Sequence, residues 1–368
     1  GAHQLHRPLP ESQLTFVELL MTGGYHTAAA GKWHLGNPAK RAFNKVYPAG
    51  DASGCANWVR SLKERPKNKP FFLWLAAVDP HRGYQPNIIE KPHTDNDAVV
   101  PPFLPNVPAT RGDLAMYYDE ITRLDSHLGK TLAELEAQGE ADNTLVLFIS
   151  DNGRPFPRCK TTILDSGIKT PWIVRWPARV KPGSVCSQLV SSIDIAPAFL
   201  ELAGLSRAYS FQGVDFSPLL SKPNRPVREY VHAEHNWHDF DDHQRGARSL
   251  SHKYIRTRYT DIPLTPPADA VSGPTYQKMI RMNDAGLLVG PKQICFQAPR
   301  PAEELYDLAN DPFEMRNLLL NPRSTDLVVL QKMRRELDRW TLETGDDPPA
   351  ERRPDEFHRV TGKRLKPR

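Results

Sequence analysis

The sequence lacks the features that mark several large classes of protein. Its four cysteines form no CxxC pair and no zinc-finger spacing, so they predict neither a disulfide framework nor a structural zinc site. No apolar stretch approaches the ~18 residues of a membrane span. The net charge of +5 is small, and we expect the basic tail at residues 351–368 to be a solvated extension. These absences argue against a membrane span and against nucleic acid as a partner.

What the sequence does contain is typical of a globular protein with a large buried core. The chain has 368 residues, of which 39% are hydrophobic and 25% charged. Its 35 prolines indicate many ordered turns and argue against a helical bundle or a coiled coil.

The order of apolar segments predicts a layered α/β fold. Continuous apolar runs at residues 70–80 and 143–150 are typical of strands buried on both faces. Between them, residues 111–138 carry apolar side chains every three to four positions, which predicts a helix with a capping box at Thr110 and Asp113. A strand, a helix and a second strand in this order indicate a βαβ unit. We expect further strands at 25–31 and 170–177, and helices at 12–22 and 191–204.

The character of the sequence changes near residue 225. We therefore expect an α/β domain at 1–225, a smaller α+β subdomain at 226–345 and a disordered basic tail at 346–368. The subdomain should contain a strand at 252–259 and a terminal helix at about 324–343. Residues 260–300 give no clear prediction.

Three predicted strands end in polar residues that can carry out chemistry. Lys32 and His34 follow the first, Asp79 and His81 the second, and Asp151 and Asn152 the third. Ligands in open α/β sheets bind beyond the carboxyl ends of the strands, so we expect these side chains to contribute to one site.

Each of these groups has a chemical interpretation and a structural one. Asp151 and Asn152 offer oxygen ligands for a hard cation, but Asp-Asn-Gly is also a common turn. A lysine such as Lys32 or Lys160 can hold an anion, and His34 and His81 can transfer protons near neutral pH. Taken one at a time, the structural interpretation is the better one, namely a turn for Asp151 with Asn152 and an ordinary surface strand end for Lys32 with His34. Together they predict hydrolysis of a tetrahedral anionic ester, either a sulfate or a phosphate.

Several ordered motifs resemble the type I sulfatases of the alkaline phosphatase superfamily. They are GYHTAAAGKWHLG, FISDNG with Lys160, DSGIKTPWIVRWP and ELYDLANDPFEMRNL. Three further stretches resemble the heparan N-sulfatases (sulfamidases): FFLWLAAVDPHRGY, VVPPFLPNVPATRGDLAMYYDEITRLD and SDNGRPFPRCKT. The resemblance implies an alkaline-phosphatase-like layered α/β sandwich, truncated at its N-terminus, with a smaller C-terminal α+β subdomain.

The resemblance also implies a role for each candidate residue. Asp151 and Asn152 would be two ligands of Ca²⁺. Lys32 and Lys160 would bind sulfate oxygens, His81 would protonate the leaving group, and His34 would act as the base that releases sulfate. Contacts with the substrate would come from Arg158, His238, Asp239 and Asp242, although a polar surface loop explains the stretch HNWHDFDDH equally well.

The family's nucleophile is a formylglycine made from Cys or Ser in a C/S-x-P/A-x-R motif. We expect it upstream of Gly1, with two more metal-ligating Asp residues and about one βαβ unit, because residues 1–20 resemble the family's segment on the C-terminal side of that motif. Cys159 and Cys295 do not have the motif's spacing. We therefore expect the chain to be an inactive fragment.

The implied substrate is a sulfated sugar or glycosaminoglycan, with glucosamine N-sulfate of heparan-type glycans as the leading candidate. The resemblance further implies a secreted, periplasmic or lysosome-like location, and it allows a homodimer. Two alternatives stay open at this point. One is a phosphatase or phosphodiesterase of the same superfamily, and the other is a protein without catalytic activity that binds sulfated glycans.

Overall fold

The computed structural model describes residues 8–205 and 210–365, and these divide into two compact units. Unit 1 comprises residues 1–92, 116–148 and 173–228, and unit 2 comprises 93–115, 149–172 and 229–368. The change in sequence character expected near residue 225 lies close to residue 228, where the last segment of unit 1 ends. Both units are discontinuous in sequence, so a single cut at that position does not separate them.

Unit 1 contains a parallel sheet of three strands in the order β2-β1-β3. Strand β1 spans His26–Gly31, β2 spans Lys45–Tyr47 and β3 spans Phe71–Ala76. In the register, Ala28 of β1 lies opposite Lys45 on one side and Leu73 on the other. Small alanines fill the middle of β1 and are fully buried there, so helices can pack closely on both of its faces.

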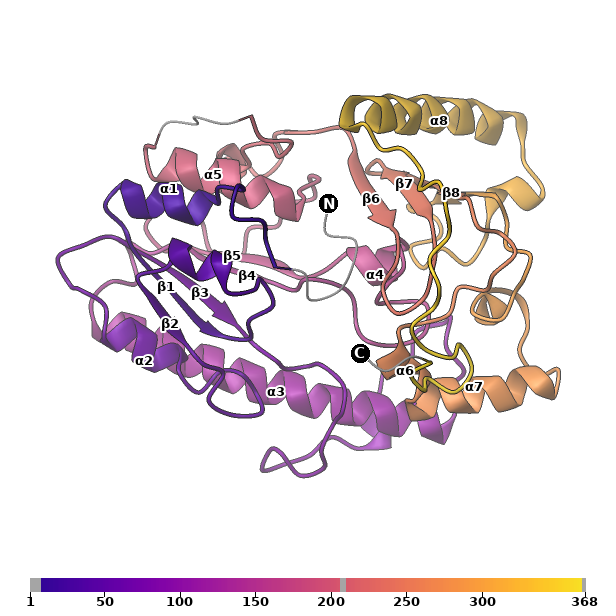
Figure 1. Ribbon diagram of the computed structural model, residues 1–368, viewed down its shortest axis with the longest axis horizontal. Coiled ribbons are helices and arrows are strands. Elements are labelled where there is room, and N and C mark those ends of the chain that lie inside the picture. The colour runs from indigo at the N-terminus through magenta and orange to yellow at the C-terminus, as the bar shows by residue number, and fades with distance from the viewer. Residues whose placement is uncertain (1–7, 206–209, 366–368) are drawn as a thin grey trace. The chain divides into compact units, whose positions relative to one another are not determined.

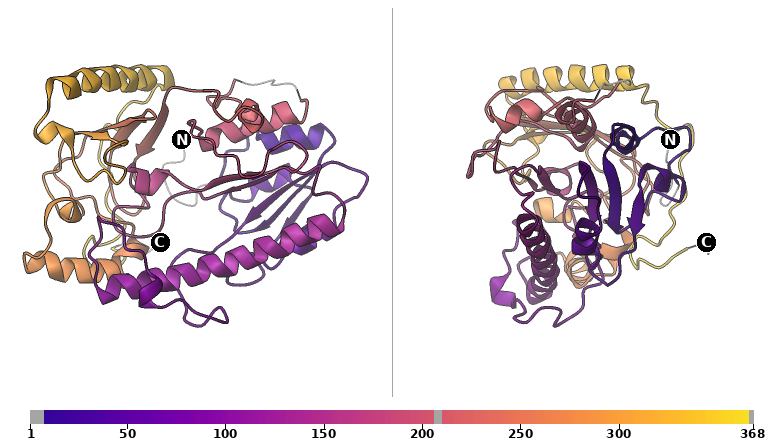
Figure 2. Two further views of the ribbon diagram at one scale, coloured as in Figure 1. Left: turned by 180° about the vertical axis from the view of Figure 1, so that it is seen from behind. Right: turned by 90° about the vertical axis from the view of Figure 1, so that its left-hand side faces the viewer.

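The two faces of this sheet have separate cores, because side chains alternate along a strand. Ala28, Leu73 and Leu75 pack with Trp58 of α2 (Trp58–Lys63) and Leu124 of α3 (Pro108–Ala137). On the other face, helix α1 (Phe16–Thr22) packs against β1, and the rings of Phe16, Phe72 and Phe199 contact one another edge to face. Phe199 belongs to α5 (Ile195–Leu202), so helices cover both faces of the sheet (Figures 1 and 2).

A second, two-stranded sheet is formed by β4 (Val146–Ile149) and β5 (Trp172–Arg175). Phe148 of β4 packs on the same core as Leu73 and Leu75 of β3. Within residues 8–205 and 210–365, β3 pairs only with β1 and β4 only with β5, so each has an edge without a ladder partner. All residues of β4 are partly exposed, unlike the buried centre of β1.

Unit 2 is built on an antiparallel sheet in the order β6-β7-β8-β9. The strands span Val231–His235, Gln244–Arg248, His252–Thr257 and Glu303–Asp307. Helix α8 (Ser324–Thr344) lies along one side of this sheet (Figures 1 and 2). Tyr254 and Leu305 pack in the core that contains α8, whereas Ile255 and Tyr306 pack on the opposite face. Three more helices belong to this unit, namely α4 (Asp165–Ile168), α6 (Ala268–Val271) and α7 (Pro274–Asp284). Short 3-10 helices in the chain span Pro38–Ala42, Asp95–Asp97, Ser192–Asp194, Ser217–Leu220, Gly290–Gln293 and Leu318–Leu320.

Most elements expected from the sequence are present, with shifted ends. The capping box at Thr110 and Asp113 is wrong, because α3 already begins at Pro108. Asp113 is instead buried and accepts a hydrogen bond from the Thr275 hydroxyl at 2.5 Å. The unclear segment 260–300 holds α6 and α7.

The basic tail also differs from the disorder expected for it. Its described part makes specific contacts, such as the guanidinium of Arg359 on the Asp241 carbonyl (2.9 Å), and residues 366–368 lie outside the described part. No helix in residues 8–205 and 210–365 is long and apolar enough to cross a membrane.

Candidate functional site

The end of β1 places Lys32 directly beside the end of β3. Gly31 has a left-handed backbone (φ 111°), and a Cβ there would lie 1.9 Å from the Ala76 carbonyl oxygen. Because glycine has no side chain, the next N–H, that of Lys32, donates to this carbonyl at 2.8 Å. Lys32 is half-buried and His34 is exposed. The sequence therefore fixes both residues at the carboxyl end of the sheet in unit 1.

His81 lies at the end of the following strand, on a turn after Asp79 and Pro80. Its N–H donates to the Val78 carbonyl (2.9 Å), and its Nδ1 lies 2.5 Å from the Arg82 carbonyl oxygen. The ring is exposed, whereas Asp79 is buried and receives two hydrogen bonds from Arg123. The predicted proton donor thus lies on the surface, two residues from a buried ion pair.

The predicted metal ligands follow β4 on a loop in unit 2. Gly153, the residue after Asn152, donates its N–H to the Gly167 carbonyl at 2.8 Å. A Cβ at Gly153 would lie 1.9 Å from the Ser166 carbonyl oxygen, so only glycine fits at this close approach. Asp151 is exposed, and its Oδ1 accepts the Asn152 N–H at 3.0 Å.

These two residues match a hard cation in the type of ligand but not in number. Ca²⁺ takes six to eight oxygen ligands, and an adjacent carboxylate and amide supply the right kind of atom. Among the residues that the structure describes, no group of three or more His, Cys, Asp or Glu side chains could hold a metal ion. Asp151 and Asn152 could therefore be part of a calcium site, and further oxygen ligands would be needed to complete it.

Lys160 lies on a strained loop in unit 2. Arg158 and Thr161, on either side of it, both have left-handed backbones (φ 65° and 67°). Such conformations cost on the order of 1–3 kcal/mol each in residues other than glycine, and they are concentrated at functional sites. The Lys160 ammonium lies 3.1 Å from a carboxylate oxygen of Asp269 in α6. No sequence pattern pointed to Asp269, because it lies in the segment 260–300 that gave no clear prediction.

Arg158 has a different environment from the one that its predicted role requires. Its side chain is buried, and it donates to the carbonyl oxygens of Phe313 (3.0 Å) and Glu314 (2.5 Å). The guanidinium also lies over the Phe103 ring, 4.9 Å from its centroid. A contact between Arg158 and a substrate would require these interactions to break.

The end of β6 and the loop after it carry two histidine–carboxylate pairs. His238 Nδ1 lies 3.1 Å from Asp239 Oδ2, and His235 Nδ1 lies 3.4 Å from Asp242 Oδ2. Asp239 also accepts the N–H of Ala268, the first residue of α6, at 2.7 Å. Burial opposes ionisation of Asp239, but the contact with His238, the N–H of Ala268 and the charge of Lys160 together outweigh it and lower the pKa of this carboxyl.

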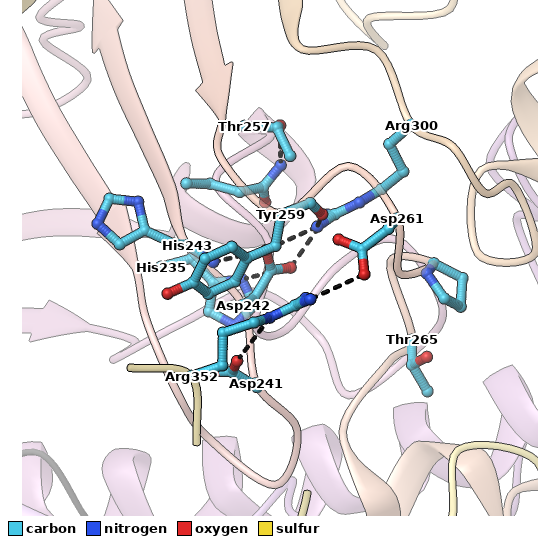
Figure 3. A network of polar contacts seen from close by, with 12 residues as sticks. His235, Asp241, Asp242, His243, Thr257, Tyr259, Asp261, Thr265, Arg300 and Arg352 are labelled. Atoms are coloured by element: carbon cyan, nitrogen blue, oxygen red, sulfur yellow. Dashed lines mark hydrogen bonds and ion pairs between the residues drawn. The ribbon is translucent and has the colours of Figure 1, made fainter. Parts of the chain in front are cut away.

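Asp242 belongs to a buried ionic network (Figure 3). Arg300 donates to both of its carboxylate oxygens, at 3.0 and 2.7 Å, and also to the Tyr259 carbonyl. Burial opposes ionisation here too, but His235 and Arg300 together hold the pKa of Asp242 well below its usual value. In the same view Arg352 reaches the carboxylate of Asp241. Arg300 had no sequence signal, because only the fold brings it to Asp242.

These pairs line a small polar pocket. It is bounded by polar groups of unit 2, including Thr161 next to Lys160, His235, His238 and Arg359. Asp239 and Asp242 also line it, so the structure brings together three of the predicted substrate contacts. Lys32, His34 and His81 belong to unit 1, and the other predicted residues belong to unit 2.

One stretch of the chain fits the pattern of the formylglycine motif, although we expected the motif upstream of Gly1. Ser221, Pro223 and Arg225 have the required spacing. Ser221 is exposed on the turn that ends the 3-10 helix Ser217–Leu220, not beyond a strand of the sheet. Its position gives no reason to treat it as the nucleophile.

Comparison with known proteins decides the family. The sulfatase family profile matches residues 45–205, and the profile of the C-terminal domain of N-sulphoglucosamine sulphohydrolase matches residues 159–262. An ulvan-active sulfatase from Formosa agariphila is 35% identical over 250 residues, which are 67% of this chain and 41% of that protein. The chain belongs to the sulfatase family.

Human N-sulphoglucosamine sulphohydrolase is another relative of the chain, 29% identical over 89% of this chain and 73% of that protein. Among solved structures, a protein in complex with its substrate D-glucosamine-2-N,6-O-disulfate is similar with a TM-score of 0.67 and 18% identity. The alignment covers 93% of this chain and 84% of that one. These matches confirm the predicted family and the alkaline-phosphatase-like α/β fold. The chain spans only about two-fifths of the length of the ulvan-active sulfatase.

Proposed function

We propose that this chain forms part of a calcium-dependent sulfatase that acts on sulfated glycans, with glucosamine N-sulfate of heparan type as the substrate. The observation that carries the proposal is the match of residues 159–262 to the sulphohydrolase C-terminal domain. That segment contains Lys160 and the whole loop that lines the pocket with His238, Asp239 and Asp242. The relative solved with a sulfated glucosamine supports the same class of substrate.

In this proposal each catalytic or metal-binding candidate has one chemical task. Lys32 and Lys160 bind sulfate oxygens as point charges. His81, exposed on its turn, protonates the leaving nitrogen or oxygen, and His34 acts as the base that assists release of sulfate. Asp151 and Asn152 supply two oxygen ligands to Ca²⁺, which would polarise the sulfate group. A formylglycine from outside the described residues would supply the nucleophile.

Unpaired sheet edges support the proposal that the complete active site includes a segment outside the described residues. Leu73, Leu75 and Phe148 pack on one core, yet β3 and β4 each have an edge without a ladder partner among the described residues. Parallel sheets are normally continuous and covered on both faces. A further strand between β3 and β4 would satisfy both edges and would end beside the carboxyl end of β3.

The proposed substrate class can be tested by binding to the chain itself. Calorimetric titration should show that glucosamine N-sulfate binds more tightly than glucosamine, because Lys160 interacts with the sulfate. Lys160→Ala should reduce the affinity for the sulfated sugar by roughly tenfold, as expected for a charged hydrogen bond. Lys332→Ala is the matched control, since Lys332 is an exposed lysine paired with Glu229. Equal affinity for both sugars would contradict the proposal.

Catalysis is tested separately. The 368-residue chain should release no sulfate from aryl sulfate or from glucosamine N-sulfate. A longer version with the C/S-x-P/A-x-R motif should release it in a calcium-dependent reaction that prefers aryl sulfate to aryl phosphate. Turnover by the 368-residue chain that His34→Ala abolishes would show that the chain needs no further nucleophile.

A further inference from the structure

A buried group of three charged side chains lies beneath the turn that carries His81. Asp79 receives two hydrogen bonds from Arg123, from Nε to Oδ2 and from the terminal nitrogen to Oδ1, both at 2.7 Å. The same guanidinium lies 3.7 Å from Glu120 Oε1, one helical turn away on α3. The side chains of Asp79 and Glu120 are only 1% and 6% exposed. None of these three residues has a role in the proposed function.

The charges of this group do not balance. Two buried carboxylates face one guanidinium, and a buried carboxylate without a partner is costly. Among the residues that the structure describes, the other charged groups near Glu120 and Arg123 are carboxylates and do not supply the missing cation. Asp119 on α3 adds negative charge near Glu120, and Asp51, in the loop before α2, contributes another carboxylate near Arg123. His127 of α3 faces Asp51 and Ser53.

One bound proton would remove the excess charge. Burial, followed by the nearby charge of Asp79, raises the pKa of Glu120 to about 7, although Arg123 opposes this shift. A protonated Glu120 can donate to Asp79 while Asp79 keeps both of its bonds to Arg123. Loss of the proton puts two negative carboxylates against each other in a poorly solvated place.

The backbone connects this group to His81. The N–H groups of Val78 and Asp79 donate to the Ser53 carbonyl, at 2.8 and 3.2 Å. The N–H of His81 in turn donates to the Val78 carbonyl at 2.9 Å, and Pro80 lies between the two. Any displacement of Asp79 therefore moves the turn on which His81 lies.

We propose that Glu120 is a positioning residue for His81: a proton held between Glu120 and Asp79 keeps Asp79 on Arg123 and so holds the turn that carries His81. The inference rests on the proposed function only for the catalytic importance of His81. The positioning itself is a property of unit 1. It makes the geometry of the proton donor depend on pH near neutrality.

The test is an NMR titration of backbone amides in the complete 368-residue chain from pH 5 to 9. In His81→Gln the ring can no longer titrate, so the amide of residue 81 reports only on neighbouring groups. We expect that amide, and the amide of Asp79, to shift with a midpoint near pH 7. In the double variant His81→Gln/Glu120→Gln both amides should be independent of pH over this range, because glutamine imitates the protonated acid.

Matched variants separate positioning from general effects of charge. Glu136→Gln changes an exposed glutamate of the same helix, paired with Arg175, and should leave the titration unchanged. Glu120→Asp keeps an acid with a shorter reach, and it should move the midpoint without abolishing the titration. This variant also decides the question if the glutamine variant does not fold.

The inference is overturned if the amide of residue 81 does not titrate in His81→Gln, or if the titration persists after Glu120→Gln. Neither result depends on sulfatase activity. A protein that shows the titration but binds glucosamine N-sulfate no better than glucosamine would keep the positioning role and lose the proposed function. A protein that binds glucosamine N-sulfate more tightly than glucosamine but does not show the titration would keep the proposed function and lose the positioning role.

Discussion

The two units treat buried charge in different ways. In unit 2, Lys253 contacts Asp165 (2.5 Å) and Glu314 (2.8 Å), and Arg248 adds a second cation on Asp165. The group is balanced, with two cations facing two carboxylates. In unit 1, Asp79 and Glu120 share a single guanidinium, that of Arg123. The first arrangement needs no proton, and the second is balanced only when it holds one.

This difference suggests different uses for buried ions. The balanced group ties together three segments that are distant in sequence. Glu314 accepts the N–H of Asp165 at the start of α4 (2.7 Å), and Lys253 lies in β8. It therefore anchors the loop of Asp151 and Lys160 to the antiparallel sheet. The unbalanced group lies beside a predicted proton donor, where sensitivity to pH can affect function.

The largest effect is expected from breaking the balanced group. Lys253→Met removes the cation between two buried carboxylates, so the free energy of unfolding should fall by about 4–5 kcal/mol. Urea denaturation followed by circular dichroism measures this change. A loss below about 1 kcal/mol would mean that Asp165 and Glu314 remain well compensated without the lysine.

A somewhat smaller loss, about 3 kcal/mol, is expected for Arg300→Met, which leaves Asp242 with His235 and one backbone N–H. The pH dependence should change as well. The folded pKa of Asp242 is lowered, so its contribution to stability is present above about pH 4 and is lost as the pH falls further. Thermal melting between pH 3 and 7 should show that the melting temperature of the variant falls less steeply toward acidic pH than that of the wild type. An equally steep fall in both proteins would argue against this account.

Glu120→Gln should have the opposite sign. The folded pKa of Glu120 is raised, so the native protein binds more protons than the unfolded chain between about pH 4.5 and 7, and wild-type stability falls as the pH rises through this range. The variant removes this fall and should be more stable by on the order of 1–2 kcal/mol at pH 8, after allowance for screening. Denaturation at pH 5 and pH 8 measures the difference. A variant less stable than wild type at pH 8 would contradict the unbalanced charge.

The smallest effect is expected for an exposed pair. Glu229→Gln removes the 2.7 Å ion pair with Lys332, in which both side chains are more than half exposed. Surface pairs contribute little, because water and salt screen them. Urea denaturation should not resolve the variant from wild type, and a clear loss would show that burial is not what separates the strong pairs from the weak ones.

Sequence patterns predicted the elements of unit 1 well, because their signals are local. The apolar run at 70–80 contains β3, and the periodic stretch at 111–138 corresponds to α3. The start of α3 was predicted incorrectly. Thr110 and Asp113 satisfy the pattern of a capping box, but the helix continues back to Pro108, and a tertiary bond to Thr275 occupies the Asp113 carboxylate.

Only those residues of the candidate site that lie in recognisable sequence motifs or at strand ends could be predicted. Lys32, His81, Asp151 and Lys160 became candidates because each follows a strand end or lies in a family motif. Asp269 and Arg300 were not, since each acts through a partner more than 50 residues away. Glu120 and Arg123 were hidden for another reason, namely that polar residues on an amphipathic helix normally face solvent.

The sequence by itself determined the family, the α/β class, the strand ends that carry the candidate chemistry and the glycines that allow close backbone approach there. Those properties depend on local patterns: apolar runs, strand–helix order and the absence of a side chain at Gly31 and Gly153. The tertiary structure alone decided which charges are paired and which carboxylates are buried without a cation of their own. Ionic balance depends on distances of a few ångströms between residues far apart in the chain, and only the packed fold sets those distances.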